Sequence, residues 1–346
     1  MIDKKQGEFE FIKSFIGKFS RTGKDVIVGA GDDAGVVKVS GDEYLLATTD
    51  ALVDGVHFKS ALFRPEDVGR KSIAVNVSDI AAMGGRPAYC LVSLVLPKSL
   101  DESYKNRLYD GIVQECERYD IQIIGGNVSG GKELVVDVFL LGKVASDKVI
   151  LRSGAKVGDK VLVTGSLGDA AAGLQLLKLK EIRGRENDRE LRFRTSRNDN
   201  NLISKQLTPT PRLKEALMIA ESGLATSMID ISDGLGQDIG HICDSSGVGV
   251  RIYEDRLLIG EGVVEVAERM GKKPLELVLL GGEDYELCFT ASEKHVEKIK
   301  SAIESKTKTL VSVVGEILEK EVGRLLVLRN GEVVPLLDTG WDHFGS

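Results

Sequence analysis

Carboxylate side chains stand at unusual places along this sequence of 346 residues. Asp32 and Asp33 are adjacent in "VGAGDDAGVV", although like charges repel each other and neither Asp nor Gly favours a strand. Further aspartates have equally apolar neighbours: Asp50 ends "LLATTD", Asp79 lies in "AVNVSDIAAMGG", and Asp230 and Asp233 lie in "MIDISDGL". Each one alone is compatible with a helix cap or a turn. Together they indicate a shared chemical role.

A divalent cation is the natural partner of these acids. A buried carboxylate costs several kcal/mol unless it is paired, hydrogen-bonded or bound to a metal, and the nearby bases in the sequence are few, mainly Arg70 and Lys71. Oxygen ligands suit Mg²⁺, which commonly binds phosphate as well. We therefore expect a cation and a glycine-lined turn to offset the repulsion between Asp32 and Asp33.

Two glycine-rich stretches match nucleotide-binding motifs by letter but not by context. Residues 29–34, "GAGDDA", match the dinucleotide fingerprint, which must open a helix, whereas the strand-like "GVVKV" follows. Residues 126–132, "GNVSGGK", match the start of a P-loop, but Glu133 stands where Ser or Thr is needed. We reject both motifs.

Strand-like and helix-like segments alternate along the chain and must position the acids. The expected strands are 25–29, 35–39, 43–50, 88–97, 121–126, 133–144, 159–165, 225–232, 249–253, 284–290 and 310–317. The expected helices are 8–19, 65–83, 101–119, 168–179, 211–222 and 234–246. Residues 180–200 are charged and almost free of aliphatic side chains, which indicates a surface loop. The pattern restarts near residue 150. It predicts an α/β (α+β) protein with two domains, 1–150 and 151–346.

Composition excludes several classes of partner. The net charge is −7, from 53 acidic and 46 basic residues, which argues against nucleic acid and anionic membranes as partners. The N-terminus does not read as a signal peptide, and the apolar runs are shorter than a membrane span. The four cysteines lack metal-ligand or redox spacing. We expect a cytoplasmic protein with reduced thiols.

Eight segments in a fixed order carry a family resemblance. They are "GDDAGVV", "TTDALVDGVHF", "AVNVSDIAAMGGRP", "IIGGNVSGG", "LRSGAKVGDKVLVTGSLGDAAAGL", "IDISDGL", "GGEDYEL" and "GWDHF". The sequence resembles the thiamine-monophosphate kinase family, within the ATP-binding superfamily of aminoimidazole-ribonucleotide synthetase, over nearly its whole length. The resemblance implies a β-rich N-terminal domain whose strands pair across a homodimer, followed by a C-terminal α/β domain.

The same resemblance implies an activity and a set of site residues. The reaction is transfer of the γ-phosphoryl group of ATP to thiamine monophosphate, assisted by several Mg²⁺ ions. The implied catalytic residues are Asp33, Asp50, Asp79 and Asp233, and the implied metal ligands are these four with Thr49, Asn127 and Asp230. The implied nucleotide contacts are Thr48, Thr49, Gly125, Gly126, Asn127, Arg152 and Ser232. The thiamine-phosphate side would be lined by His57, Glu283 and Trp341.

The implied chemistry agrees with the residues. A phosphate monoester is mostly dianionic at neutral pH, and each pair of unit charges at ~4 Å costs about 4 kcal/mol at an effective dielectric near 20. Cations must offset that repulsion, and the ionised nucleophile needs no general base, so direct in-line transfer is expected.

Asn127 departs from the family pattern, which usually has Asp there, and the change removes a charge from one metal site. Two alternatives stay open: a superfamily relative that activates an amide or carboxylate oxygen with ATP, and a non-catalytic Mg²⁺–nucleotide sensor.

Overall fold

The first sheet carries the first group of predicted site residues. In the computed structural model, which describes residues 23–185 and 197–337, this sheet has six strands in the order β1-β2-β3-β6-β4-β5. The strands are β1 Val26–Val28, β2 Gly35–Ser40, β3 Glu43–Val53, β4 Arg86–Pro97, β5 Gln122–Gly131 and β6 Val135–Ala145. Only β4 and β5 run parallel among these neighbours. The predicted helix 8–19 and Trp341 lie outside the described residues.

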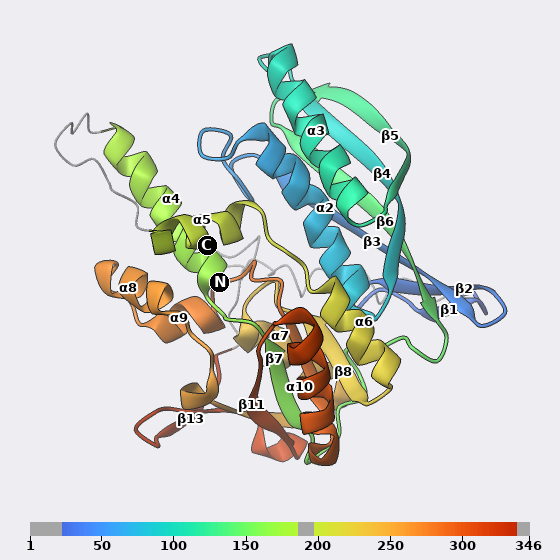
Figure 1. Cartoon of the computed structure of the whole chain (residues 1–346), viewed down its shortest axis with the longest axis vertical. Helices are drawn as coiled ribbons and strands as arrows, with labels where there is room; N and C mark the ends of the chain where they lie inside the picture. Colours follow the sequence, from blue (N-terminus) through green and yellow to red (C-terminus); the bar gives the residue numbers. More distant parts are fainter. Residues whose placement is uncertain (1–22, 186–196, 338–346) are drawn as a thin grey trace, which may run out of the picture.

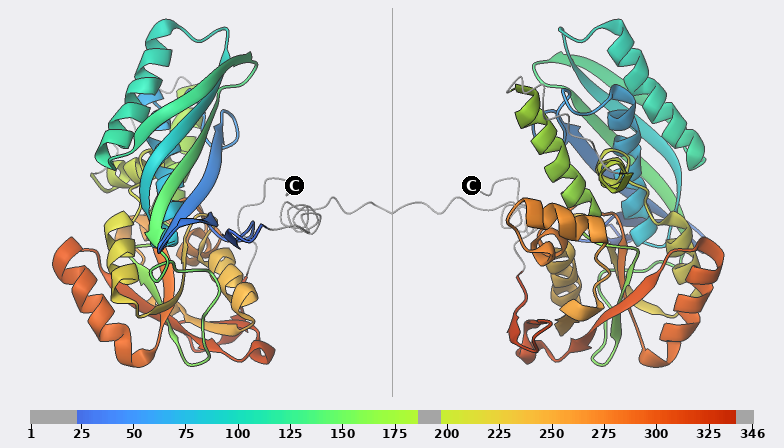
Figure 2. Two further views of the ribbon diagram at one scale, coloured as in Figure 1. Left: turned by 90° about the vertical axis from the view of Figure 1, so that its right-hand side faces the viewer. Right: turned by 60° about the vertical axis from the view of Figure 1, so that its left-hand side comes forward.

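Helices α2 (Pro65–Ala82) and α3 (Glu102–Arg118) cover one face of this sheet (Figure 1; Figure 2, left). The two helices cross at backbone contact, because a Cβ added to Gly111 would lie 2.2 Å from the carbonyl oxygen of Glu66. Most residues of α2 are buried. This helix is therefore a rigid support for Asp79, which lies near its C-terminal end.

The second sheet has seven strands in the described residues, in the order β13-β12-β9-β11-β7-β10-β8. They are β7 Lys160–Thr164, β8 Ala225–Asp230, β9 Gly249–Tyr253, β10 Leu287–Ala291, β11 Val311–Leu318, β12 Arg324–Val327 and β13 Val333–Pro335. Helices α6 (Leu213–Ser222) and α10 (Glu293–Thr307) share a core with one face, and α7 (Leu235–Ser246) and α9 (Pro274–Leu279) share a core with the other. Burial on both faces explains why "KVLV" carries apolar residues without polar alternation.

Three helices of the second half complete the core of the first. They are α4 (Asp169–Arg185), α5 (Arg197–Leu207) and α8 (Glu261–Arg269). Leu176 of α4, Leu202 of α5 and Val263 of α8 belong to the same buried cluster as the first sheet and α2. The two halves of the chain thus share a continuous interface, and the candidate site lies there.

Most expected elements are confirmed within a few residues, but three are corrected. The loop expected at 180–200 is wrong at both ends, because α4 runs to Arg185 and α5 begins at Arg197. Lys, Glu and Arg are good helix formers, so a helix at the surface needs few aliphatic residues. The strand expected at 284–290 begins only at Leu287, because Tyr285 has a left-handed backbone with φ +50°. The strand expected to end at residue 126 continues through the glycines to Gly131.

Among the described residues, no helix combines the length and apolar composition of a membrane span. Neither rejected nucleotide motif is followed by a helix, as expected. Strand β2 follows "GAGDDA", and most of "GNVSGGK" lies in β5, with β6 as the next element. All four cysteines are buried free thiols.

Candidate active site

A cavity of about 640 Å³ lies between the two halves of the chain. Its wall combines the end of β3 (Thr48 to Leu52), Asp79 of α2, Arg152, the Ser232–Asp233 turn and the glycine-rich segment 281–283. These segments are far apart in the sequence. The cavity therefore exists only where the two halves meet.

Three predicted aspartates converge at this interface. Asp33 precedes β2, Asp79 lies on α2 and Asp230 ends β8, and one carboxylate oxygen of each lies within 4.8 Å of the others. Two hydroxyl groups hold the cluster: Thr48 Oγ1 donates to Asp79 Oδ2 at 2.5 Å, and Ser78 Oγ donates to Asp230 Oδ2 at 2.5 Å. The structure thus brings together three of the five aspartates expected to share a site, whereas Asp233 belongs to a separate cluster described below.

Burial and mutual repulsion raise the pKa values of this cluster. Burial raises the pKa of Asp230 to about 8, with a further contribution from the charge of Asp33. Burial, followed by the charges of Asp50 and Asp230, holds the pKa of Asp79 well above its ordinary value. The cluster therefore binds protons readily when no other cation is present.

Arg152 resolves part of the repulsion between Asp32 and Asp33. Its Nη2 lies 2.5 Å from Asp33 Oδ1, and its backbone N–H donates to the Asp32 carboxylate at 3.2 and 3.3 Å. The residues next to Asp32 and Asp33 in the sequence did not indicate that Arg152 would be their counter-charge. Burial, followed by the charge of Asp33, raises the pKa of Asp32 to about 6.

The donor set of the first cluster fits a divalent cation. Asp33 Oδ2 is buried without a hydrogen-bond partner, while Arg152 occupies only the other oxygen. An unpaired buried carboxylate oxygen is costly, and neighbouring carboxylates offer the oxygen ligands that Mg²⁺ prefers. The chemistry of these side chains is therefore compatible with a bound divalent cation.

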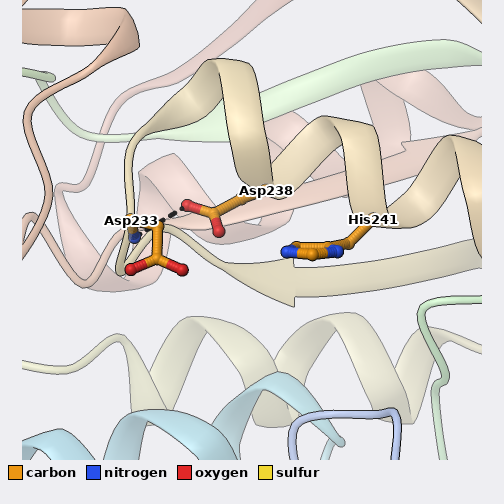
Figure 3. Close-up of side chains that lie close together, drawn as sticks. All are labelled: Asp233, Asp238 and His241. Atoms are coloured by element: carbon orange, nitrogen blue, oxygen red, sulfur yellow. Dashed lines mark hydrogen bonds between the residues drawn. The ribbon is translucent and has the colours of Figure 1, made fainter. Parts of the chain in front are cut away.

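A second cluster surrounds the start of α7. One ligand atom each of Asp233, Asp238 and His241 lies within 4.8 Å of the others, and Figure 3 shows all three along one side of this helix. Asp238 Oδ2 accepts the backbone N–H groups of Asp233 at 3.2 Å and Gly234 at 3.1 Å. Sequence reasoning missed Asp238 and His241. The available signal was their spacing of three residues, which places both on one helix face.

Asp50 lies on the cavity wall between these groups. The side chain is open to the cavity, but the surrounding protein removes much of its hydration; this desolvation, followed by the charges of Asp233 and Asp137, raises its pKa to about 7. Asp137 of β6 also escaped prediction, although Thr49 Oγ1 donates to its Oδ1 at 3.0 Å. Its only signal is an acid inside the apolar strand "VVDVF". Thr48, Thr49 and Ser232, the predicted nucleotide contacts, also line the cavity.

His57 and Glu283 also line the cavity. Val53 N–H donates to His57 Nδ1 at 3.0 Å, so Nδ1 is an acceptor. Lys71, completely buried on α2, places its Nζ 2.7 Å from Glu283 Oε1. Sequence reasoning considered Lys71 only as a nearby base and did not assign it to the site.

Gly125, Gly126 and Asn127 lie elsewhere in the chain's own fold. They line a separate groove of about 540 Å³ on β5, together with Tyr109 of α3. At Gly126 an added Cβ would lie 2.0 Å from the carbonyl oxygen of Val92, so only glycine fits between β5 and β4. Within one chain these residues are not brought together with the aspartates.

Comparisons with known proteins point to one family over nearly the whole chain. Residues 31–144 match the family model described as AIR synthase related protein, N-terminal domain, and residues 156–327 match its C-terminal domain. The thiamine-monophosphate kinase of Escherichia coli (strain K12) is 34% identical over 340 residues, covering 98% of this chain and 99% of the relative. The thiamine-monophosphate kinase of Aquifex aeolicus (strain VF5) is 40% identical over 260 residues, covering 75% and 79%. A solved structure described as AaThiL complexed with AMPPCP and TMP has a TM-score of 0.81 at 34% identity and covers 99% of both chains.

Proposed function

The chain belongs to the thiamine-monophosphate kinase family, and from that premise we propose that it transfers the γ-phosphoryl group of ATP to thiamine monophosphate, giving thiamine diphosphate and ADP. The observation that carries the proposal is the convergence of Asp33, Asp79 and Asp230 beside a cavity that Asp33 and Asp79 line. The complex of a similar protein with AMPPCP and TMP supports the choice of substrates. The four free thiols suit a reducing cytoplasm, where we place the reaction.

Several Mg²⁺ ions take part in the proposed reaction. The metal ligands would come from two groups of side chains. The first group is Asp33, Asp79 and Asp230, and the second is Asp50, Asp233 and Thr49. Bound Mg²⁺ supplies positive charge that neutralises the phosphates and stabilises the charge of the transition state. The residues fit this role because carboxylate oxygens of Asp33, Asp79 and Asp230 lie within 4.8 Å of one another, and Asp33 Oδ2 is buried without a hydrogen-bond partner.

The chain's own residues align the reactants. Arg152 fixes one oxygen of Asp33, and the Asp238 carboxylate fixes the backbone of the Asp233–Gly234 turn, so both ligands are positioned before substrate arrives. The acceptor phosphate is already ionised, so no general base is needed. We infer direct in-line transfer, with alignment and electrostatics as the protein's contribution.

The substrate side of the cavity is assigned to His57, Glu283 and Trp341. His57 and Glu283 line the cavity together with apolar side chains such as Phe58 and Leu277. A cavity lined by both polar and apolar side chains suits a phosphate joined to flat heterocycles.

A homodimer would complete the nucleotide site. Strand β5 ends the first sheet and exposes Ile124 at 55% and Val128 at 66%. An unpaired edge with exposed apolar side chains is a natural surface for pairing with a second copy. In that dimer Gly125 and Gly126 would allow the backbone to approach the nucleotide, and Asn127 would offer an oxygen ligand to a metal.

The test is a coupled turnover assay. The protein is incubated with MgATP, with and without thiamine monophosphate, and ADP and thiamine diphosphate are quantified. We expect both products, only when thiamine monophosphate is present. ADP without thiamine diphosphate would favour a relative that activates a different oxygen. Nucleotide binding without any turnover would favour a sensor. Asp79→Asn should nearly abolish turnover in this assay, and Asp110→Asn, an exposed position on α3, is its matched control.

A further inference from the structure

Three polar residues, Lys71, Gln206 and Glu283, form a connected group at the cavity wall, and only Glu283 has an assigned role so far. Glu283 and Gln206 of α5 both line the cavity, and Lys71 lies behind them. Lys71 Nζ is 2.7 Å from Glu283 Oε1 and donates to the backbone oxygen of Gln206 at 3.1 Å. The lysine is completely buried, and its Nζ lies 5.6 Å from the centre of the Phe63 ring. Lys71 therefore fixes both neighbours from inside the core.

The side chain of Gln206 presents an unpaired acceptor. Its Nε2 donates to Glu283 Oε2. Because a carboxylate can only accept, this bond fixes which end of the amide is the oxygen. The residue is only 1% exposed, and Oε1 is buried with no hydrogen-bond partner. A buried acceptor without a donor is unfavourable, so the site is built for a donor from a ligand.

The backbone of Glu283 is held in an unusual conformation. Its φ of +70° lies in the left-handed region, which costs free energy for a non-glycine residue. Its N–H donates to the Ser232 carbonyl at 2.7 Å, and the next residue, Asp284, accepts the N–H groups of Gly168 at 2.7 Å and Ala170 at 3.1 Å. The surrounding structure thus imposes the direction of the Glu283 side chain.

We propose that Gln206 Oε1 and the Glu283 carboxylate together recognise the exocyclic amino group of the substrate's aminopyrimidine ring, with Lys71 as a positioning residue. This inference rests on the proposed function. The amino group is the neutral N–H donor of thiamine monophosphate, and its two hydrogens match two adjacent acceptors. The pyrimidine nitrogens are acceptors, and the thiazolium ring has no N–H. The subsite therefore favours a substrate that carries an amino group at this position of the ring.

The experiment compares thiamine monophosphate with oxythiamine monophosphate, in which oxygen replaces the amino group. Steady-state kinetics and calorimetric binding are measured for wild type, Gln206→Leu, Glu283→Gln and Lys71→Met. We expect wild type to prefer the amino substrate by about a hundredfold, and Gln206→Leu to reduce that preference to about tenfold through KM and not kcat. Lys71→Met should raise KM for thiamine monophosphate while leaving KM for ATP unchanged. Gln114→Leu, an exposed glutamine on α3, is the matched control.

The outcomes separate this inference from the proposed function. Turnover of both analogues at equal kcat/KM, or equal losses for both in Gln206→Leu, overturns the subsite and leaves the kinase assignment intact. Preferential binding of the amino compound without turnover overturns the kinase assignment and supports the subsite. Absence of both binding and turnover overturns both.

Discussion

Metal affinity of the aspartate cavity is expected to depend steeply on pH. Cations bind the ionised form of a carboxylate, so protons compete with the metal. Asp230 has a pKa of about 8, because it is buried and lies beside Asp33. The perturbation is a change from pH 6 to pH 8 during a titration with Mn²⁺, a spectroscopic substitute for Mg²⁺.

The magnitude follows from the ionised fraction of Asp230. With a pKa of about 8, roughly 1% of this carboxyl is ionised at pH 6 and roughly 50% at pH 8, so the apparent association constant rises about 50-fold, or about 2.3 kcal/mol. Asp50, with a pKa of about 7, adds at most about tenfold. Its contribution is smaller than that limit, since this residue is exposed to the solvent of the cavity and its charge is screened.

Stability of the metal-free protein should change in the opposite direction. The native pKa of Asp230 lies above its ordinary value of 3.8, so the native state holds the proton more tightly than the unfolded chain. This contribution to stability is complete below pH 3.8 and is lost as the pH rises through about 8. We expect Tm of the metal-free protein to fall between pH 5 and pH 8, and the increase in Tm caused by Mg²⁺ to grow over the same range.

The assay is Mn²⁺ binding followed by electron paramagnetic resonance at pH 6, 7 and 8, with thermal unfolding in parallel. Asp230→Asn should bind metal more weakly and lose most of the pH dependence, whereas the exposed Asp110→Asn should behave as wild type. A wild-type affinity that is flat between pH 6 and pH 8 would refute the reasoning. So would an Asp230→Asn variant with the full wild-type pH dependence.

Three further predictions concern the two substrates and the support of the site. Asp79→Asn should lower kcat by at least about 10³-fold without lowering Tm of the metal-free protein, because the amide avoids the cost of ionising a buried group and its oxygen can still accept from Thr48; near-normal turnover would contradict its role as a ligand. Gly111→Ala should reduce the free energy of unfolding by about 2–3 kcal/mol, since the new Cβ would lie 2.2 Å from the Glu66 carbonyl. Urea titration measures the loss, and Gly23→Ala, where an added Cβ meets nothing within 4 Å, is the control. Trp341→Ala should raise KM for thiamine monophosphate several-fold and KM for ATP little; equal effects would exclude stacking on the substrate.

The layout of strands and helices was predictable because local patterns decide it. "VLVT" and "LCFTA" are buried along their whole lengths, and such runs read as strands without knowledge of their partners. The aspartates were predictable for the same reason: an acid directly after an apolar strand, as Asp230 after "ATSMI", has few structural explanations. These features are visible within ten residues of sequence.

Contacts between residues far apart in the sequence could not be predicted from such local patterns. Arg152 meets Asp33 across 119 positions, and Lys71 meets the Gln206 carbonyl across 135. Nothing in either local sequence marks the partner, because the pairing depends on how α2, α5 and the two sheets pack. The left-handed backbone of Glu283 and Tyr285 likewise appears only once neighbouring segments impose it.

The charge of the cavity determines how it binds cations, the nucleotide and the acceptor phosphate. Asp33, Asp50, Asp79 and Asp233 line a wall where Arg152 already engages Asp33, so the metal-free cavity carries excess negative charge. Two phosphate-bearing substrates would be repelled from such a wall. Burial, together with the charges of neighbouring carboxylates, raises the pKa values of Asp79 and Asp230, so both groups bind protons more tightly than usual. When these carboxyls are ionised and no metal is bound, the cavity repels phosphates, so we expect it to bind its substrates together with divalent cations. Metal binding and substrate binding must therefore be thermodynamically coupled.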